Sequence, residues 1–219
     1  MGLQFASFPG MRWDAKECAA RWHLMFPRPS TRHRQSYLDA PDGDLLMWAA
    51  EGDTAAFEQV VRRHGRAMLR VARRLAPERA VAEDLVQETF MRAWKNARQF
   101  DGSRGAVVTW LYRIVTNLCI DARRRRTPDM VTEDPGIASP LPLSDEIIER
   151  TDEIVALSNA LTTLPAHYAA VFTLVYDEGL TGVQAADILG LSVKAVERRL
   201  FRARALLRTS LLPERRSLT

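Results

Sequence analysis

The sequence predicts an all-α protein made of two small helical domains that a linker joins. Apolar residues recur at steps of three and four along most of the chain, which is the period of helices that bury one face. No segment shows the alternation of apolar and polar residues that is typical of a half-buried strand. A stretch at residues 127–143 holds four prolines and three acidic residues, and it divides the helical sequence into two parts.

The expected domain boundaries follow these changes in sequence. Residues 1–43 are expected to form a poorly ordered extension, because prolines interrupt them and their apolar residues keep no sustained period. We expect the first helical domain at 44–126, the linker at 127–143, the second helical domain at 144–212 and a tail at 213–219. The linker has no basic residue, and its acidic, Pro-rich composition cannot bury enough apolar surface to fold alone.

Charge and cysteine content narrow the class of protein. The formal net charge is only +4, but the arginines are clustered, which favours a polyanionic partner. The two cysteines, Cys18 and Cys119, lie far apart and do not make a disulfide framework. No apolar run reaches 18 residues and the N-terminus lacks the apolar core of a signal peptide, so we expect a cytoplasmic protein without direct membrane insertion.

Capping residues mark the expected helix starts of the first domain. Asp44 is expected to cap a short helix that ends near Glu51, and Asp53 to cap the long helix that follows. Pro77 is expected to begin the next helix, because a first turn does not need its missing N–H. The apolar residues at helical spacing in these two helices should be buried: Phe57, Val60, Val61, Met68, Val71, Leu75, Val86, Phe90 and Trp94.

A third long helix is expected from about Ala106 to Arg126. One of its faces should pack in the core and carries Trp110, Ile114 and Leu118. A second face carries Arg113, Asn117, Asp121 and Arg124. The helix ends in four consecutive arginines, Arg123, Arg124, Arg125 and Arg126, which suit the helix dipole and can bind phosphates. From this segment alone, a charged end that merely keeps the helix soluble explains them equally well.

The second domain is expected to hold four helices. The first carries apolar residues at helical spacing: Ile147, Ile148, Ile154, Leu157 and Leu161. Pro165 begins the second helix. The last two helices form a helix-turn-helix, in which Thr181 and Gln184 have the spacing of a capping box. Gly190 tolerates the positive φ that ends the first of them, and Ser192 caps the second.

The final helix combines an apolar stripe with a basic face. The stripe, which should pack inward, contains Val193, Val196, Leu200, Ala203 and Leu207. The basic face carries Lys194, Arg198, Arg199, Arg202, Arg204 and Arg208. The second helix of a helix-turn-helix enters the major groove, where an arginine fork can bond guanine O6 and N7 together. A solvated face of an ordinary amphipathic helix is the alternative, but the preceding capped helix and glycine turn favour DNA binding.

Three segments resemble one family of proteins. Residues 83–94, Glu-Asp-Leu-Val-Gln-Glu-Thr-Phe-Met-Arg-Ala-Trp, resemble the second conserved region of bacterial sigma factors. Residues 110–126 are similar to the neighbouring segment that meets the promoter −10 element, and 164–208 to the −35-binding fourth region. With only a linker between them, the arrangement resembles the extracytoplasmic-function (ECF) group of RNA polymerase sigma factors. The resemblance covers about residues 44–212.

The resemblance implies roles for the first domain. It implies that the exposed face of the helix at 83–94 binds the clamp helices of the largest polymerase subunit through Glu83, Asp84, Gln87, Glu88 and Arg92. It also implies that the loop at 101–105 receives a −10 base flipped out of the non-template strand. The implied −10 contacts are Asp101, Gly102, Ser103, Arg104, Arg113, Asn117, Arg123, Arg124, Arg125 and Arg126.

The second domain would bind the −35 element and the polymerase flap. The implied −35 contacts are Ser192, Lys194, Glu197, Arg198, Arg199, Phe201, Arg202 and Arg204. Glu197 stands where many relatives have Lys or Arg, and a carboxylate repels phosphate but can accept from cytosine N4. Gly182-Val183-Gln184 also departs from the usual aromatic and acidic residues that begin the first helix of the motif.

Other classes of protein explain less of the sequence. A DNA-binding regulator would share the last helices but would leave residues 84–94 and 123–126 without a purpose. An enzyme is disfavoured, because no Gly-rich phosphate loop, metal-ligand cluster or activated nucleophile is evident, and His64 and His167 lie within helical patterns. The spacing of Cys18, His23 and His33 fits no zinc pattern. A sigma mimic that only titrates a regulator would not need both basic faces.

The sequence thus predicts a sigma factor rather than an enzyme, with no cofactor, metal or small-molecule substrate. Its expected partners are core RNA polymerase and promoter DNA. The family resemblance further implies an anti-sigma factor, a role in a stress or envelope response, and a cytoplasmic protein that its anti-sigma factor can hold at the inner membrane.

Overall fold

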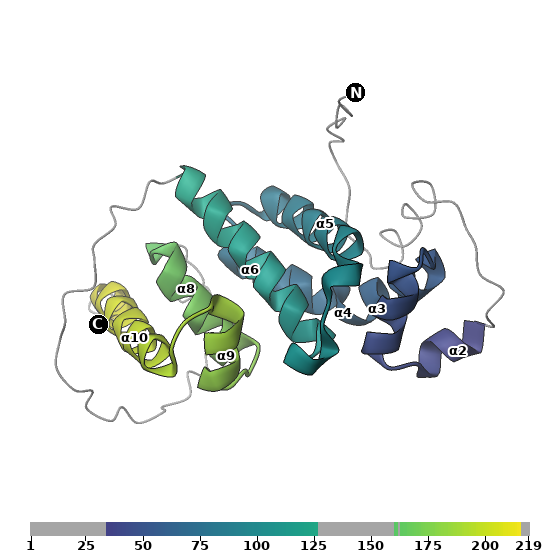
Figure 1. Cartoon of the computed structure of the whole chain (residues 1–219). Helices are drawn as coiled ribbons and strands as arrows, with labels where there is room; N and C mark the ends of the chain where they lie inside the picture. The colour runs from purple at the N-terminus through teal and green to yellow at the C-terminus, as the bar shows by residue number, and fades with distance from the viewer. Residues whose placement is uncertain (1–33, 127–159, 162, 216–219) are drawn as a thin grey trace.

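The structure is a computed structural model that describes residues 34–126, 160–161 and 163–215 (Figure 1). The first part contains α2 (Arg34–Asp39), α3 (Asp42–Ala50), α4 (Thr54–Leu75), α5 (Arg79–Lys95), η1 (Ala97–Gln99), η2 (Gly102–Arg104) and α6 (Val107–Arg126). The second part contains α8 (Ala166–Phe172), the π-helical turn η3 (Thr173–Asp177), α9 (Gly182–Leu189) and α10 (Val193–Arg215). The described residues form no strand, so the all-α prediction is confirmed for them.

The long helix α4 is the centre of the first domain and packs against α3, α5 and α6. Asp53 caps it as expected, because its Oδ1 accepts the N–H groups of Ala55 and Ala56, both at 3.1 Å. Phe57 is fully buried, and its ring meets the edge of the Trp94 ring with centroids 5.2 Å apart. Among the expected core residues of α4 and α5, only Trp94 keeps partial exposure.

Two of the expected helix starts are wrong. The short helix begins at Asp42, two residues before Asp44, and Asp44 is exposed and does not cap it. Asp42 is instead held by α4, because its carboxylate accepts from Arg63 at 2.6 Å and lies 2.7 Å from Nε2 of His64. Burial opposes the charge of Asp42, but these two partners outweigh burial and lower its pKa. Helix α5 begins at Arg79 rather than at Pro77.

The first domain also begins earlier than expected. Residues 34–43 were expected to belong to a poorly ordered extension, but they form α2 and the start of α3. Tyr37 is buried, and its hydroxyl donates to Oδ2 of Asp53 at 2.9 Å. Arg63 donates to the backbone carbonyls of Tyr37, Leu38 and Ala40. A short helix in a Pro-rich stretch has no clear period, so tertiary contacts decide its conformation. Residues 1–33 lie outside the described residues.

Helix α6 has the expected length but a different buried face. Leu118 is buried as expected, whereas Trp110 and Ile114 are only half-buried. The fully packed stripe contains Leu111, Tyr112, Val115, Leu118 and Cys119. The helix has a neighbour on more than one side, because α4, α5, α8 and α9 all contact it. Burial raises the pKa of the Cys119 thiol to about 12, so this cysteine stays protonated and unreactive.

The second domain follows its local sequence signals closely. Thr181 and Gln184 form the expected capping box, and Gly190 ends α9 in the left-handed conformation with φ 65°. Ser192 Oγ accepts the N–H of Ala195 at 3.2 Å, as its capping role requires. Val196, Ala203 and Leu207 of α10 are buried, but Val193 is 39% exposed, contrary to expectation. Most of the helix expected from Ile147 to Leu161 lies outside the described residues, as does the linker at 127–143.

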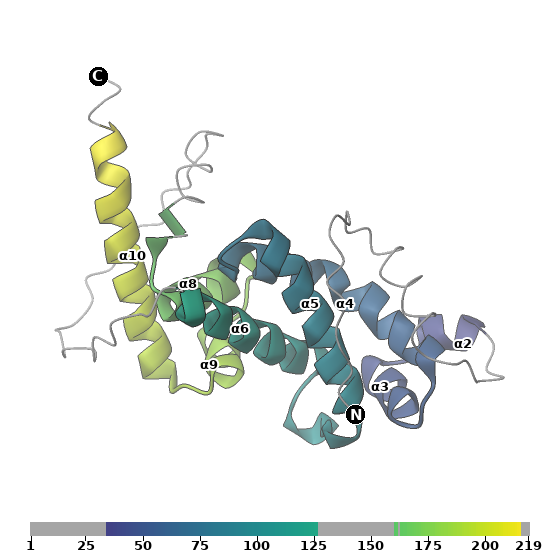
Figure 2. The same ribbon diagram turned by 90° about the horizontal axis from the view of Figure 1, so that it is seen from above.

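The two domains lie side by side rather than apart. Figures 1 and 2 show α8 and α9 alongside α6, and the buried apolar residues of both domains form one continuous cluster. Helix α10 packs on α8 and α9 at the far side from α4 and α5. This packing brings residues around 70 and 112 next to residues around 178, which nothing in the sequence pattern foretold.

Candidate nucleic-acid interface

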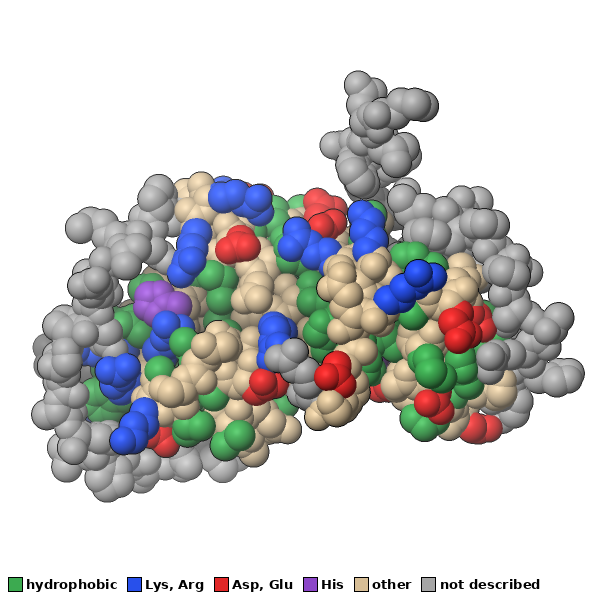
Figure 3. Space-filling model, viewed as in Figure 1, with side chains coloured by type: hydrophobic (Ala, Val, Ile, Leu, Met, Phe, Trp, Pro, Cys, Tyr) green, Lys and Arg blue, Asp and Glu red, His purple; other side chains and the backbone are tan. Residues whose placement is uncertain are grey.

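The first candidate surface is the outward face of α10. The charged side chains that are exposed there, and so accessible to DNA, are Lys194, Glu197, Arg198, Arg204 and Arg208, and Ser192 just before the helix is exposed as well. Arg199, Phe201 and Arg202 are half-buried. On the face seen in Figure 3, basic side chains lie over α8–α10 and also over α5 and α6, and acidic side chains lie over α2 and α3 and between the basic ones elsewhere. All eight residues expected at the −35 element therefore lie on or beside one helix, with differing access to solvent.

The turn before α10 fixes how this helix is presented. Because Gly190 is left-handed, the N–H of Leu191 can reach the carbonyl of Ala186 at 2.9 Å, which ends α9 and turns the chain. The guanidinium of Arg204 lies 5.1 Å from the centre of the Tyr176 ring, a cation–π contact that ties it to η3. The contact restricts Arg204, whereas Lys194 and Glu197 at the start of α10 remain exposed.

The second candidate surface is the loop before α6. Oδ1 of Asp101 accepts from the backbone N–H and the hydroxyl of Ser103, at 3.0 Å and 2.7 Å, and this stabilises the turn. Gly105 has φ 146°, a conformation that other residues rarely adopt, so the loop needs glycine there. Asp101, Gly102 and Ser103 are exposed, while the side chain of Arg104 lies outside the described part.

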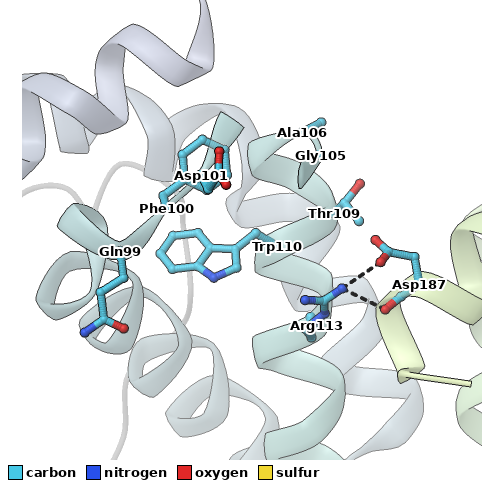
Figure 4. Close-up of a pocket in the computed structure, with 9 residues that line it drawn as sticks. All are labelled: Gln99, Phe100, Asp101, Gly105, Ala106, Thr109, Trp110, Arg113 and Asp187. Atoms are coloured by element: carbon cyan, nitrogen blue, oxygen red, sulfur yellow. Dashed lines mark hydrogen bonds and ion pairs between the residues drawn. The ribbon is translucent and has the colours of Figure 1, made fainter. Parts of the chain in front are cut away.

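A pocket opens between this loop and the first turns of α6 (Figure 4). It is lined by Gln99, Phe100, Asp101, Gly105, Ala106, Thr109, Trp110, Arg113 and Asp187. The rings of Phe100 and Trp110 lie 5.5 Å apart between centroids and give the pocket an aromatic wall on which a base could stack. Asp187 comes from α9 of the other domain, and sequence reasoning missed it because 74 positions separate it from its partner Arg113.

The C-terminal end of α6 divides its arginines into two groups. Asn117, Arg124 and Arg125 are exposed on the helix. Arg126 is exposed as well but pairs with Glu78 at the start of α5. Arg123 is half-buried and donates to the backbone carbonyl of Leu164 in the second domain. The four consecutive arginines are therefore not equivalent, and Arg123 joins the two domains.

The exposed face of α5 forms a third candidate surface. Asp84, Gln87 and Arg92 are exposed, and Glu83 and Glu88 are half-buried, on the side opposite the buried residues of this helix. Glu88 pairs with Arg92 at 2.7 Å, one turn further along, and Glu83 lies 3.7 Å from Arg73 of α4. The surface is a polar row on a rigid, well-packed helix, which suits a protein partner better than DNA.

A metal site or a membrane-spanning helix among the described residues would point to another class of protein. No group of three or more His, Cys, Asp or Glu side chains there could hold a metal ion. None of the helices in that part of the chain is long and apolar enough to cross a membrane. His64 has a structural role, since it helps to hold Asp42 and thereby α3.

Comparisons with known proteins define the class. The sigma-70 region 2 family model matches residues 60–128, and the sigma-70 region 4 model matches 154–207. The RNA polymerase sigma factor NccH of Alcaligenes xylosoxydans xylosoxydans is 35% identical over 179 residues, which cover 78% of this chain and 94% of the relative. The ECF sigma factor SigM of Mycobacterium tuberculosis is 33% identical over 176 residues, covering 80% and 84%.

Solved structures agree with this result. CnrH, in complex with the cytosolic domain of CnrY, superposes with a TM-score of 0.59 at 34% identity, over 79% of this chain and 97% of that chain. RpoE of Bartonella quintana, in complex with the anti-sigma factor NepR, gives 0.52 at 26% identity, over 71% and 96%. Both are similar in fold to this chain.

The two family regions, in this order on an all-α chain, define a sigma-70-type sigma factor. The chain belongs to the ECF group of bacterial RNA polymerase sigma factors. It therefore binds core RNA polymerase and promoter DNA in the cytoplasm and directs transcription initiation through the −10 and −35 elements. Sigma factors are not enzymes, so the chain directs the polymerase to promoters and catalyses no reaction itself.

Proposed function

We propose that the three surfaces divide the work of this sigma factor. The polar row of α5 binds the clamp helices of the largest polymerase subunit, the pocket before α6 and the end of α6 bind the −10 element, and α10 binds the −35 element. The domain boundaries proposed for these roles are 34–126 and 144–212. The observation that carries the proposal is that the three surfaces lie mainly on different elements: α5, the loop before α6 together with α6, and α10.

The −10 role rests on the chemistry of the pocket and its surroundings. A flipped base needs an aromatic wall and nearby hydrogen-bonding groups, and Phe100, Trp110 and Asp101 supply them. Arg124 and Arg125 are exposed on the same helix and can bind phosphates of the strand around that base. Arg123 has a smaller part in −10 binding, because its guanidinium already donates a hydrogen bond to the backbone carbonyl of Leu164.

The −35 role rests on the start of α10. The first turns of a recognition helix reach base edges, and Lys194, Glu197 and Arg198 are exposed there. Glu197 accepts from cytosine rather than pairing with guanine, so it makes the preferred −35 sequence of this chain differ from that of relatives with a basic residue.

We also propose that an anti-sigma factor controls the chain and can hold it at the inner membrane in an envelope or stress response. Two structurally similar sigma factors have been solved with a bound protein: CnrH with the cytosolic domain of CnrY, and RpoE with the anti-sigma factor NepR. No residue of this chain identifies such a partner, so the support is similarity of fold and sequence.

Run-off transcription with purified core polymerase on genomic fragments tests the proposal. We expect promoter-specific transcripts whose upstream sequences share a −10 and a −35 motif, and copurification of the chain with core polymerase. A chain that binds duplex promoter DNA by itself and yields no transcript would instead be a simple regulator.

A further inference from the structure

Opposite charges meet where the two domains contact each other. The α4 and α6 side contributes Arg70, Arg74, Tyr112 and Arg113. The other side contributes three carboxylates from η3, the residue after it and α9, which we call the acidic edge: Asp177, Glu178 and Asp187. The domain that carries the basic face of α10 thus turns an acidic side toward the other domain.

Glu178 makes the densest set of contacts. Its two carboxylate oxygens accept from Nε and Nη2 of Arg70 at 3.0 Å and 2.8 Å, and the Tyr112 hydroxyl donates to Oε2 at 2.7 Å. The Glu178 side chain is only 2% exposed. Burial and this hydrogen bond raise the pKa of Tyr112, so it remains a donor. A two-pronged arginine–carboxylate pair is among the stronger polar contacts in proteins.

Asp187 brings the acidic edge into the candidate −10 pocket. It lines the pocket, and Nη2 of Arg113 donates to both its backbone carbonyl and its Oδ1 at 2.8 Å (Figure 4). Nε of Arg113 is buried without a hydrogen-bond partner, so this arginine is only partly satisfied in the packed arrangement. A carboxylate and a carbonyl therefore occupy the position from which a DNA phosphate would approach Arg113.

We propose that the acidic edge is a latch built into the chain, which closes the second domain over the −10 pocket until DNA and polymerase displace it. Its carboxylates offer the arginines the same charge and bidentate geometry as a phosphate. The inference rests on the −10 role proposed for the pocket. It adds a closed state that needs no second protein.

Distance shows that the latch must open in the working complex. Positions −10 and −35 are about 25 base pairs apart, which is roughly 85 Å of duplex at about 3.4 Å per base pair. A compact unit of about 150 residues has a radius of gyration near 15 Å. Since duplex DNA is stiff over about 150 base pairs, the packed domains cannot reach both elements. The residues between Arg126 and Ala160 are numerous enough to permit separation, at up to about 3.3 Å each.

The closed state is tested first by charge exchange on the full chain. Glu178→Arg and Arg70→Glu should each separate the domains and enlarge the radius of gyration measured by small-angle X-ray scattering. The double variant R70E/E178R should restore the compact value, because the pair is rebuilt with its charges exchanged. Glu51→Arg changes the charge by the same amount at an exposed position just after α3 and should leave the radius unchanged.

The consequence for DNA is tested with the same variants. The probe is a fluorescein-labelled single strand that carries the non-template −10 sequence of a promoter mapped by run-off transcription. We expect E178R to bind it at least about fivefold more tightly than the unmodified chain or E51R, as opening a closed state allows. Circular dichroism checks that E178R keeps its helices. Restored compactness in R70E/E178R shows that an arginine at position 178 does not by itself unfold the domains.

Two results would overturn the latch. One is a radius of gyration that E178R leaves unchanged, and the other is domain separation without tighter binding of the −10 strand. Failure of the proposed function gives a different pattern. In that case the unmodified chain directs no promoter-specific transcript with core polymerase, while the scattering contrast between E178R and R70E/E178R still appears.

Discussion

The two domains reach their structure by different means. The first domain depends on long helices, α4, α5 and α6, whose large apolar residues pack together: Phe57, Phe90, Met68 and Leu111 are each at most 2% exposed. In the second, α8 and α9 have seven and eight residues, too few to be stable alone. Caps, a left-handed glycine and contacts with α6 and α10 compensate. We therefore call the first domain the scaffold. The second domain, whose helices depend on local signals and on packing against the scaffold, we call the reader.

This comparison predicts that the largest functional effect comes from the surface of the scaffold. Asp84→Lys with Glu88→Lys should abolish assembly with core polymerase, because it reverses the charge of the α5 row without touching its buried face. The cost in stability should be small, since the exposed Glu88–Arg92 pair contributes only about 0.3–0.5 kcal/mol. Copurification with core polymerase measures assembly, and circular dichroism measures the cost in stability.

The matched control is Asp44→Lys with Glu51→Lys, which adds the same charge at two exposed positions, one in α3 and one just after it. Normal assembly of the α5 variant would remove the polymerase-binding role of this helix. Lost assembly in both variants would point to net charge rather than to the surface.

The largest effect on stability should come from the core of the scaffold. Phe57→Ala removes a fully buried ring that touches Phe90 and Trp94, and should lower the free energy of unfolding by about 3–5 kcal/mol. Urea unfolding followed by circular dichroism measures this. Val183→Ala, at an exposed position of α9, should change it little. A small effect at Phe57 would show that the first domain does not carry the fold.

Local signals made the reader the easier domain to predict. The capping box of Thr181 and Gln184 and the turn at Gly190 act within a few residues, so the sequence pattern contains the whole interaction. Asp53 was predicted for the same reason. The helix start at Asp44 was wrong because tertiary partners compete with local preference: Arg63 and His64 bind Asp42, where the helix begins. The start at Pro77 was two residues too early.

The candidate site was predictable only in part. The exposed faces of α5 and α10 follow from helical spacing, because a helix that buries one side must expose the other. Glu178 packs on Arg70, which lies 108 residues earlier in the chain, and on Tyr112, which lies 66 residues earlier. No pattern in one sequence encodes such pairings. Asp187 could be recognised only as an exposed polar residue of α9.

The recognition helix of the reader should show an intermediate effect. Arg198→Ala with Arg202→Ala removes two groups that would bind bases or phosphates, and each good base contact gives about 1–3 kcal/mol of discrimination. Transcription from a matched promoter should fall by about tenfold or more, without loss of assembly with core polymerase. Run-off transcription measures this decrease.

Arg62→Ala with Arg66→Ala, two exposed arginines of α4, is the control and should leave transcription unchanged. Unchanged output from the α10 variant would contradict its assignment to the −35 element.

The smallest effect separates local capping from packing in the reader. Thr181→Ala removes the hydroxyl that accepts the N–H of Gln184 at 3.2 Å, and should lower the free energy of unfolding by about 1 kcal/mol. Thr209→Ala is the matched control, because the hydroxyl of Thr209 bonds only to a carbonyl one turn back in α10 and caps nothing. Urea unfolding of both variants gives the difference. Equal values would mean that packing on α6, and not the cap, stabilises α9.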